Sequence, residues 1–176
     1  MKKQQNMVIN YKNLLNDFLS MREWTDELED DAESSVITLS TGIKCGDQGG
    51  RLILTGNYGN GLIDVYIYLD QQCKEGKLDQ MAVLLNGLHQ RWSYGRFMVF
   101  SDGYVRWQHR VDFEGCNPTA DTINNIVQVG WDVMSLYSDT IITVALTKQS
   151  AADALKEFDV SQNNETNDDG EGPSEL

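Results

Sequence analysis

The side chains of this chain that could do chemistry near neutral pH are two histidines, His89 and His109, and three cysteines, Cys45, Cys73 and Cys116. Imidazole titrates near neutrality, so a histidine can transfer protons or sense pH. Cysteine and histidine also bind zinc when several of them lie at short, characteristic spacings. The cysteines form no Cys-x-x-Cys pair and have no zinc spacing with either histidine. This pattern is typical of free thiols in a reducing compartment, and we expect no metal site.

His109 alternates with polar residues in a strand-like run, on the same face as several apolar residues. A packed histidine with one satisfied hydrogen bond is the ordinary interpretation, and a pH-sensing or catalytic histidine is the alternative. The serines and acidic residues of the chain form no nucleophile elbow and no metal constellation. A carboxylate paired with His109 in a pocket would favour an enzyme or small-ligand sensor with its site near this residue.

The glycines Gly56, Gly59 and Gly61 are the nearest approach to a phosphate-binding loop. Their order is G-x-x-G-x-G, which reverses the dinucleotide-binding fingerprint, and a strand follows where a helix is required. The glycines of residues 46–50 lack the Gly-Lys-Ser/Thr ending of a P-loop. We therefore interpret both segments as turns and expect no cofactor, no nucleotide-dependent activity and no hydrolase activity.

Two acidic segments account for the net charge of −13. Residues 23–33 contain seven acids and no base, and residues 159–176 contain six acids and no base. The rest of the chain has fourteen acids and fourteen bases, whereas a nucleic-acid-binding surface usually shows a basic excess. No apolar run is long enough to cross a bilayer, and no apolar signal segment follows Lys2 and Lys3. We expect a cytoplasmic protein that binds neither nucleic acid nor membrane.

A β-hairpin over residues 96–114 is the clearest predicted element, and it positions His109. After Asp102-Gly103 the residues alternate between two faces, as in a half-buried strand. One face carries Val105, Trp107, His109, Val111 and Phe113, and the other carries Arg106, Gln108, Arg110, Asp112 and Glu114. Asp-Gly favours a type I′ turn, in which Phe100 would face Val105, Met98 would face Trp107 and Arg96 would face His109. We expect Trp107 to anchor the core.

In this register the outward face of the hairpin is partly apolar and partly cationic. It carries Phe97, Val99, Tyr104, Arg106 and Arg110. The two arginines lie four residues apart, with Gln108 between them on the same strand face. They could bind carboxylates of a protein or peptide partner, of a second copy of the chain, or of the chain's own acidic segments at 23–33 or 159–175. An ordinary solvated face is the alternative. A one-residue slip in register would exchange the two faces.

Hydrophobic periodicity predicts the remaining elements. Helices are expected at about 7–24, at 78–92 and from 117 onward, and strands at 37–45, 51–55 and 62–70. We interpret residues 141–146 as a continuation of the third helix, with a strand as the alternative, and residues 150–158 as a last helical turn or two. Residues 159–176 are acidic and nearly free of large apolar groups, which predicts a disordered acidic tail after a single domain at 1–158.

The order of these elements is α-β-β-β-α-β-β-α. Short glycine-rich connections favour antiparallel pairing over parallel βαβ units. The sequence therefore predicts an α+β fold. Its antiparallel sheet is built from a three-stranded meander and a two-stranded hairpin, with helices on one face.

Several short runs resemble the YbjN-domain family. They are Asn86-Gly87-Leu88-His89, Tyr94-Gly95-Arg96-Phe97, Ser101-Asp102-Gly103-Tyr104-Val105, and Gly115 followed by Asn117-Pro118-Thr119. The resemblance covers about residues 7–158 and implies a type III secretion chaperone-like fold. Family members are described as bacterial sensory transduction regulators, and no catalytic residue is among the shared positions. The β-branched run 141–146 departs from the single amphipathic C-terminal helix of that family.

Two classes of function follow. The first is a non-enzymatic protein-binding module, a chaperone-like or regulatory adaptor that holds a peptide or dimerises through its sheet. The partly apolar hairpin face and the free strand edges favour it, because strand edges accept added strands. The second is the enzyme or small-ligand sensor with a site near His109.

Overall fold

The computed structural model describes residues 2–57, 60–113 and 116–168, and their side chains except those of residues 2–10 and 164–168. The helices are α1 (Lys2–Met21), α2 (Leu78–Arg91), α3 (Ala120–Leu146) and α4 (Ala151–Asp168). The strands are β1 (Leu28–Asp31), β2 (Val36–Cys45), β3 (Gln48–Asn57), β4 (Leu62–Leu69), β5 (Arg96–Val99) and β6 (Val105–Asp112). Predictions at Gly59, Glu114, Gly115 and residues 169–176 fall outside the described residues.

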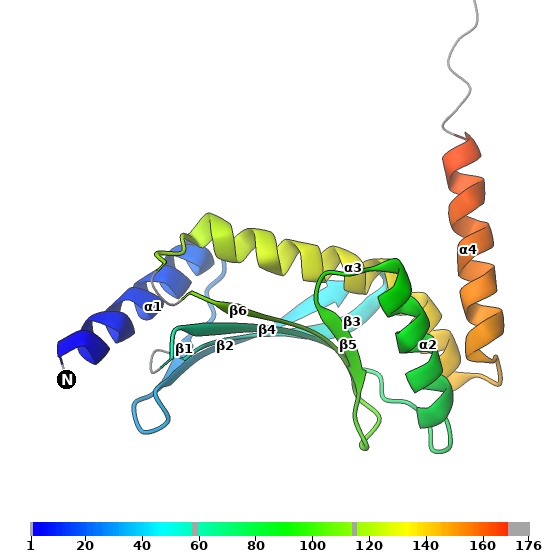
Figure 1. Cartoon of the computed structure of the whole chain (residues 1–176), viewed down its shortest axis with the longest axis horizontal. Coiled ribbons are helices and arrows are strands. Elements are labelled where there is room, and N and C mark those ends of the chain that lie inside the picture. Colours follow the sequence, from blue (N-terminus) through cyan, green and yellow to red (C-terminus); the bar gives the residue numbers. More distant parts are fainter. Residues whose placement is uncertain (1, 58–59, 114–115, 169–176) are drawn as a thin grey trace, which may run out of the picture.

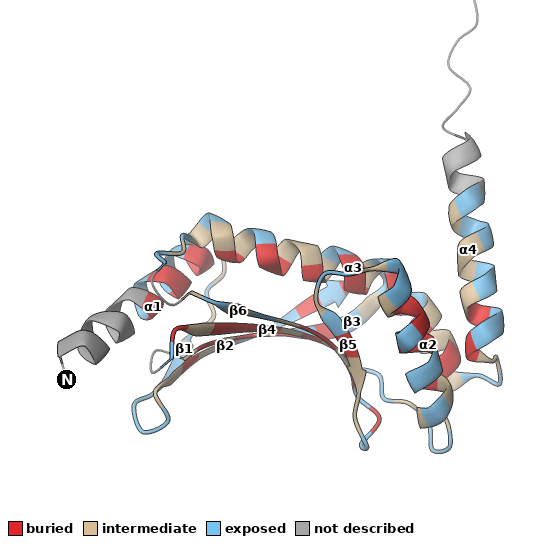
Figure 2. Ribbon diagram, in the orientation of Figure 1, coloured by how far each residue is buried: buried red, intermediate tan, exposed pale blue. Residues whose placement is uncertain are grey.

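All six strands of the described residues form one antiparallel sheet in the order β1-β2-β3-β4-β6-β5. Helix α3 lies across one face of this sheet beside α1, while α2 and α4 lie near the β5 end (Figure 1). Figure 2 shows the buried residues of α1, α2 and α3 turned toward the sheet. The predicted α+β class, the meander β2–β4 and the helices on one face are confirmed.

Strand β1 was not predicted, because residues 23–33 are acidic and read as a solvated connector. The segment 28–31 nevertheless pairs with β2, and Leu28, opposite Leu39, packs against the core. Lys12 of α1 forms an ion pair with Asp30 at 3.2 Å. Backbone pairing and one apolar contact therefore outweigh low strand propensity at this edge of the sheet.

The hairpin β5–β6 forms, but the predicted register is wrong by one residue. The structure pairs Val99 with Val105, Phe97 with Trp107 and Met98 with Arg106. The turn is a three-residue loop, in which Gly103 N donates to Phe100 O at 2.9 Å and Phe100 N donates to Tyr104 O at 3.0 Å. Gly103 has a φ of +90°, whereas Asp102 has no positive φ. This is the pattern of a type I turn with a glycine bulge, and the slip turns Phe97 and Val99 to the helix side.

Trp107 lies at the centre of the core, as predicted, with none of its side chain exposed. Its indole Nε1 donates to the Tyr94 carbonyl at 3.2 Å. Two glycines, Gly95 before β5 and Gly130 in α3, lie so close to the ring that a Cβ at either one would overlap it. The indole therefore joins the hairpin, the α2–β5 connection and α3 at one point.

Residues 141–146 continue α3, as expected from the helical interpretation. Ile141, Val144 and Ala145 are buried, so β-branched side chains are tolerated here because they pack on the core. Thr119 caps the start of α3, and its hydroxyl accepts from Thr122 N at 3.3 Å. No helix of the described residues is long and apolar enough to span a membrane.

The predicted disorder from residue 159 onward differs from the structure, in which α4 runs on to Asp168. Ala151 and Ala154 of α4 are buried, and Arg91 of α2 binds Asp159 through two hydrogen bonds of 2.9 and 2.5 Å. Helix–helix contact and this ion pair favour a helix that composition alone did not indicate. The independence of a domain at 1–158 stays a prediction.

The contact between Gly130 and the indole predicts an unusual effect of Gly130→Ala. A glycine-to-alanine change inside a helix normally stabilises by about 1 kcal/mol. Here the new methyl group would overlap Trp107, so we expect a loss of about 1–3 kcal/mol in urea unfolding. Gly42→Ala is the control, since a Cβ there meets no atom within 4 Å. If Gly130→Ala instead stabilises the protein, the Trp107 indole does not pack against Gly130.

A chain that ends after Phe158 tests the contribution of the C-terminal half of α4. It loses the bond between Arg91 and Asp159, whose side chains are 30% and 47% exposed. Exposed ion pairs contribute about 0.2–1 kcal/mol, so we expect a small decrease in thermal midpoint, similar to that of Asp159→Asn. A decrease of many degrees would show that residues beyond 158 are part of the folded domain.

Candidate functional site

The sheet face opposite α3 is the candidate functional site, and we call it the outer face. No helix of the described residues covers it (Figure 1). The pairing registers align outer-face side chains in rows across the strands. One row is Arg51, Tyr68, Arg106 and Met98, and the next is Ile53, Tyr66, Gln108 and Arg96. The centre of this face therefore combines arginines with aromatic and apolar side chains.

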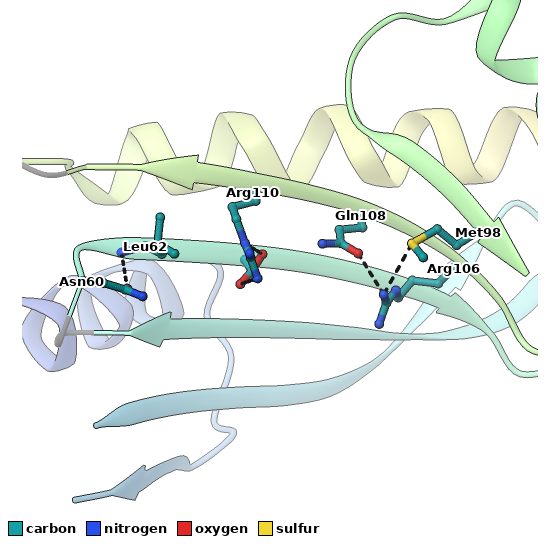
Figure 3. A network of polar contacts seen from close by, with 7 residues as sticks. Asn60, Leu62, Met98, Arg106, Gln108 and Arg110 are labelled. Atoms are coloured by element: carbon teal, nitrogen blue, oxygen red, sulfur yellow. Dashed lines mark hydrogen bonds and ion pairs between the residues drawn. The ribbon is translucent and has the colours of Figure 1, made fainter. Parts of the chain in front are cut away.

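Arg106 is the centre of a polar and aromatic cluster on the outer face. Its Nη1 donates to the Tyr68 hydroxyl at 2.8 Å, and its Nη2 donates to Gln108 Oε1 at 2.8 Å and to Met98 Sδ at 3.6 Å. Figure 3 shows the side chain of Arg106 beside Gln108 and Met98. We call the set Tyr66, Tyr68, Met98, Phe100, Arg106 and Gln108 the Arg106 cluster.

Aromatic rings hold the guanidinium of Arg106 in place. Its carbon lies 4.5 Å from the centre of the Phe100 ring, 4.6 Å from that of Tyr66 and 5.5 Å from that of Tyr68. Such cation–π contacts contribute about 0.5–2 kcal/mol each, depending on solvent access. The Nε atom of Arg106 is buried and has no hydrogen-bond partner among the described residues. The three rings and the three hydrogen bonds of Arg106 therefore hold its side chain in place before a partner binds.

Arg110, four residues further along β6, has a different environment. It binds Asp64 of β4 through two hydrogen bonds of 2.7 and 2.9 Å. The Asp64 side chain is only 9% exposed, and its carboxylate raises the pKa of Arg110. Tyr66 lies beside this pair, and its pKa is raised, first by burial and then by the charge of Asp64. Arg110 is thus already neutralised within the sheet.

The five predicted partner-binding residues do not share one face. Phe97 is buried and Val99 packs against the core, both on the helix side. Tyr104 lies next to the glycine bulge and is 36% exposed. Arg106 and Arg110 lie on the outer face, where Arg110 is paired with Asp64. The outer face instead brings Tyr66 and Tyr68 of β4 to Arg106, through a strand pairing that local patterns do not specify.

His109 packs on the helix side of the sheet between aromatic rings. Its ring stacks on Tyr94 at 4.2 Å between centres and lies 6.0 Å from Trp107. Burial lowers the pKa of His109, and the imidazole has no hydrogen bond or ion pair with a described residue. The carboxylate that would favour a catalytic or sensing role is therefore absent from its described surroundings. The described residues also contain no group of three or more His, Cys, Asp or Glu side chains that could hold a metal ion.

His89 of α2, by contrast, makes a specific contact with the hairpin. Its Nε2 accepts a hydrogen bond from the Phe97 backbone N–H at 2.5 Å. Phe97 lies on edge strand β5, and this N–H points away from β6. Burial, and to a smaller degree the charge of Arg96, lower the pKa of His89. A neutral imidazole therefore occupies the Phe97 N–H, which is a hydrogen-bond donor on the β5 edge.

Comparisons with known proteins found a similarity among solved structures but none to a family model or a curated protein. No model of a known protein family matches the chain, and the search of curated proteins found no significant match. Among solved structures, a chain in the structure of the HopA1–SchA chaperone–effector complex is similar, with a TM-score of 0.45 and 16% sequence identity. The similarity covers 70% of this chain and 88% of that chain.

The lowered pKa values of the two histidines predict a loss of stability in acid. In the folded state each imidazole takes up a proton less readily than in the unfolded chain, where it titrates near 6.5. The stabilisation is complete above that pH and decreases as the pH falls below it. We expect the unfolding free energy to decrease between about pH 7 and pH 5.

Variants separate the contributions of the two histidines. His89→Gln keeps an acceptor for Phe97 N–H but cannot titrate, so it should lose less stability over this pH range than the unaltered chain. His109→Gln is the matched comparison for burial without a hydrogen bond. If His89→Gln shows the same pH dependence as the unaltered chain, the hydrogen bond to Phe97 does not restrict protonation of His89.

Proposed function

We propose that the protein is a non-enzymatic protein-binding module, a chaperone-like or regulatory adaptor of the YbjN type, and that it binds its partner through the outer face of its sheet. The observation that carries this proposal is the Arg106 cluster. It places an arginine, a methionine and three aromatic rings on a sheet face that no described helix covers.

The composition of the cluster fits the centre of a protein interface. Tyrosine, phenylalanine, methionine and arginine are enriched in interface cores, and tyrosine and arginine are frequent among the residues that dominate binding energy. Ordering a long side chain on binding costs about 0.5–1.5 kcal/mol. Arg106 is already held by Tyr68, Gln108 and the rings, so it avoids most of this cost.

The outer face is a better candidate for the binding surface than either strand edge. Edge strand β5 has its Phe97 N–H occupied by His89, and α2 packs beside it. Edge strand β1 carries Glu29, Asp30 and Asp31 in its four residues, and charged side chains at an edge oppose strand addition. These features direct binding away from added strands and toward side-chain contacts on the outer face.

The residues of the YbjN resemblance have structural roles here. Gly95 leaves space for Trp107, and Gly103 forms the hairpin bulge. His89 connects α2 to β5. Such positions support the family proposal through the fold, whereas the Arg106 cluster supports binding through this chain's own outer face.

Site-specific photo-crosslinking tests the proposal. A photoreactive phenylalanine analogue replaces Tyr68 in the cluster or Val83 on α2, a residue that is 55% exposed on the helix side. In the native cell we expect discrete protein adducts from position 68, and we expect none of these same adducts from position 83. If both positions give the same adducts, or if position 68 gives none, the outer face is not the binding surface.

The adduct from position 68 also identifies a partner for direct measurement. Phe100→Ala removes one ring that holds Arg106, and we expect it to weaken binding of that purified partner about 30-fold, the effect of a dominant interface residue. Val83→Ala is the control, with an expected change of less than about twofold. Circular dichroism on both variants confirms that the fold is retained.

A further inference from the structure

We infer that the partner presents an acidic segment, whose carboxylates bind Arg106 together with Arg51 and Arg96 on the outer face. This inference rests on the proposed function. Its first observation is that every hydrogen-bond partner of Arg106 is neutral, namely a phenol, an amide oxygen and a thioether. Arg110 on the same strand has a carboxylate partner instead.

A guanidinium that has no anionic partner can still bind a carboxylate from another molecule. The rings of Tyr66, Tyr68 and Phe100 replace part of the water around Arg106 but supply no counter-charge. Hydrogen bonds between a guanidinium and a carboxylate are about twice as strong as those between neutral groups. The Tyr68 hydroxyl accepts from Arg106, so its own hydrogen is available to the same carboxylate.

Two further cations lie near Arg106. The register places Arg51 of β3 and Arg106 of β6 on either side of Tyr68, and Arg96 of β5 opposite Gln108. Neighbouring strands are about 4.8 Å apart, so the backbones of Arg51 and Arg106 are roughly 10 Å apart. Arg51 and Arg96 are both exposed, and neither has an ion pair within the described residues.

The outer face thus differs in charge from the rest of the molecule. On strands β2–β6 the register assigns to it five cations, which are Lys44, Arg51, Arg96, Arg106 and Arg110, and two acids, Asp64 and Asp112. Asp70, directly after β4, adds a third acid beside Gly49. Asp64 is already paired with Arg110. The chain as a whole has a net charge of −13. A cationic patch on an acidic protein is complementary to a local negative charge on a partner.

A short acidic polypeptide fits this patch better than a nucleic acid or a second copy. Glu29 and Asp31 lie on the same face at the β1 edge, where they would repel the phosphates of a longer polyanion. A second copy placed face to face about a two-fold axis through the Arg106 cluster would bring arginines against arginines. An acidic segment with interspersed apolar residues would contact the cations, the rings of Tyr66 and Tyr68, and the thioether of Met98.

Fluorescence anisotropy with the full chain tests the inference. The probes are a labelled synthetic peptide in which Glu alternates with Leu, and the same peptide with Gln in place of Glu. We expect the Glu peptide to bind at least about tenfold more tightly, by about 1.4 kcal/mol or more, and to weaken as salt is added. Arg106→Gln should remove most of this difference, and Arg106→Lys should restore part of it.

Matched variants protect the test against loss of the fold. Arg51→Gln combined with Arg96→Gln changes two exposed side chains that hold no ion pair, and it should also weaken the Glu peptide at least about tenfold. Lys148→Gln removes an exposed cation outside the outer face and should leave affinity within about twofold. Retention of affinity in both arginine variants would overturn the inference.

The remaining outcomes separate this inference from the proposed function. Equal binding of the Glu and Gln peptides, or no saturable binding of the Glu peptide up to about 1 mM, overturns the acidic partner. Tighter binding of a DNA oligomer of equal charge, or a doubling of mass in light scattering that Arg106→Gln abolishes, overturns it in favour of another occupant. In each case crosslinking from position 68 still decides whether the outer face binds protein.

Discussion

The packing of Trp107 against two glycines is the contact on which the rest of the structure depends. Gly95 and Gly130 come from different elements, and both lack the side chain that would displace the indole. With Trp107 held inward, the two-residue period of β6 turns Arg106, Gln108 and Arg110 to the opposite side. The outer face is therefore a direct consequence of the way the core is packed.

Strand β5 is held by contacts on both faces and at its edge, and these link the fold to the candidate site. On the helix side Phe97 packs against Tyr137, with 5.9 Å between the ring centres. At the edge its N–H binds His89, and on the outer face Met98 contacts Arg106. A shift of β5 would therefore disturb the core and the Arg106 cluster together.

The sequence predicted the parts of this fold that depend on local periodicity. The alternation in β6 assigned Trp107 and Arg106 to the correct faces, and the stripe in α3 carried through residues 141–146. The Asp102-Gly103 pair did not distinguish a two-residue turn from a three-residue loop with a bulge, and β5 was placed one residue out of register. Strand β1 and the end of α4 depend on pairing and ion pairs between distant segments, so composition alone missed them.

The two arginines of β6 show why a candidate site needs the neighbouring strand as well as the strand itself. In sequence Arg106 and Arg110 are equivalent cations on one face. Across the sheet, Arg110 meets Asp64 and Arg106 meets Tyr68. The paired residues are 38 apart in the chain for Tyr68 and Arg106 and 46 apart for Asp64 and Arg110, so no local pattern specifies the pairing. This pairing neutralises one arginine and leaves the other among rings and neutral acceptors, so the residue on the adjacent strand decides which cation can serve a partner.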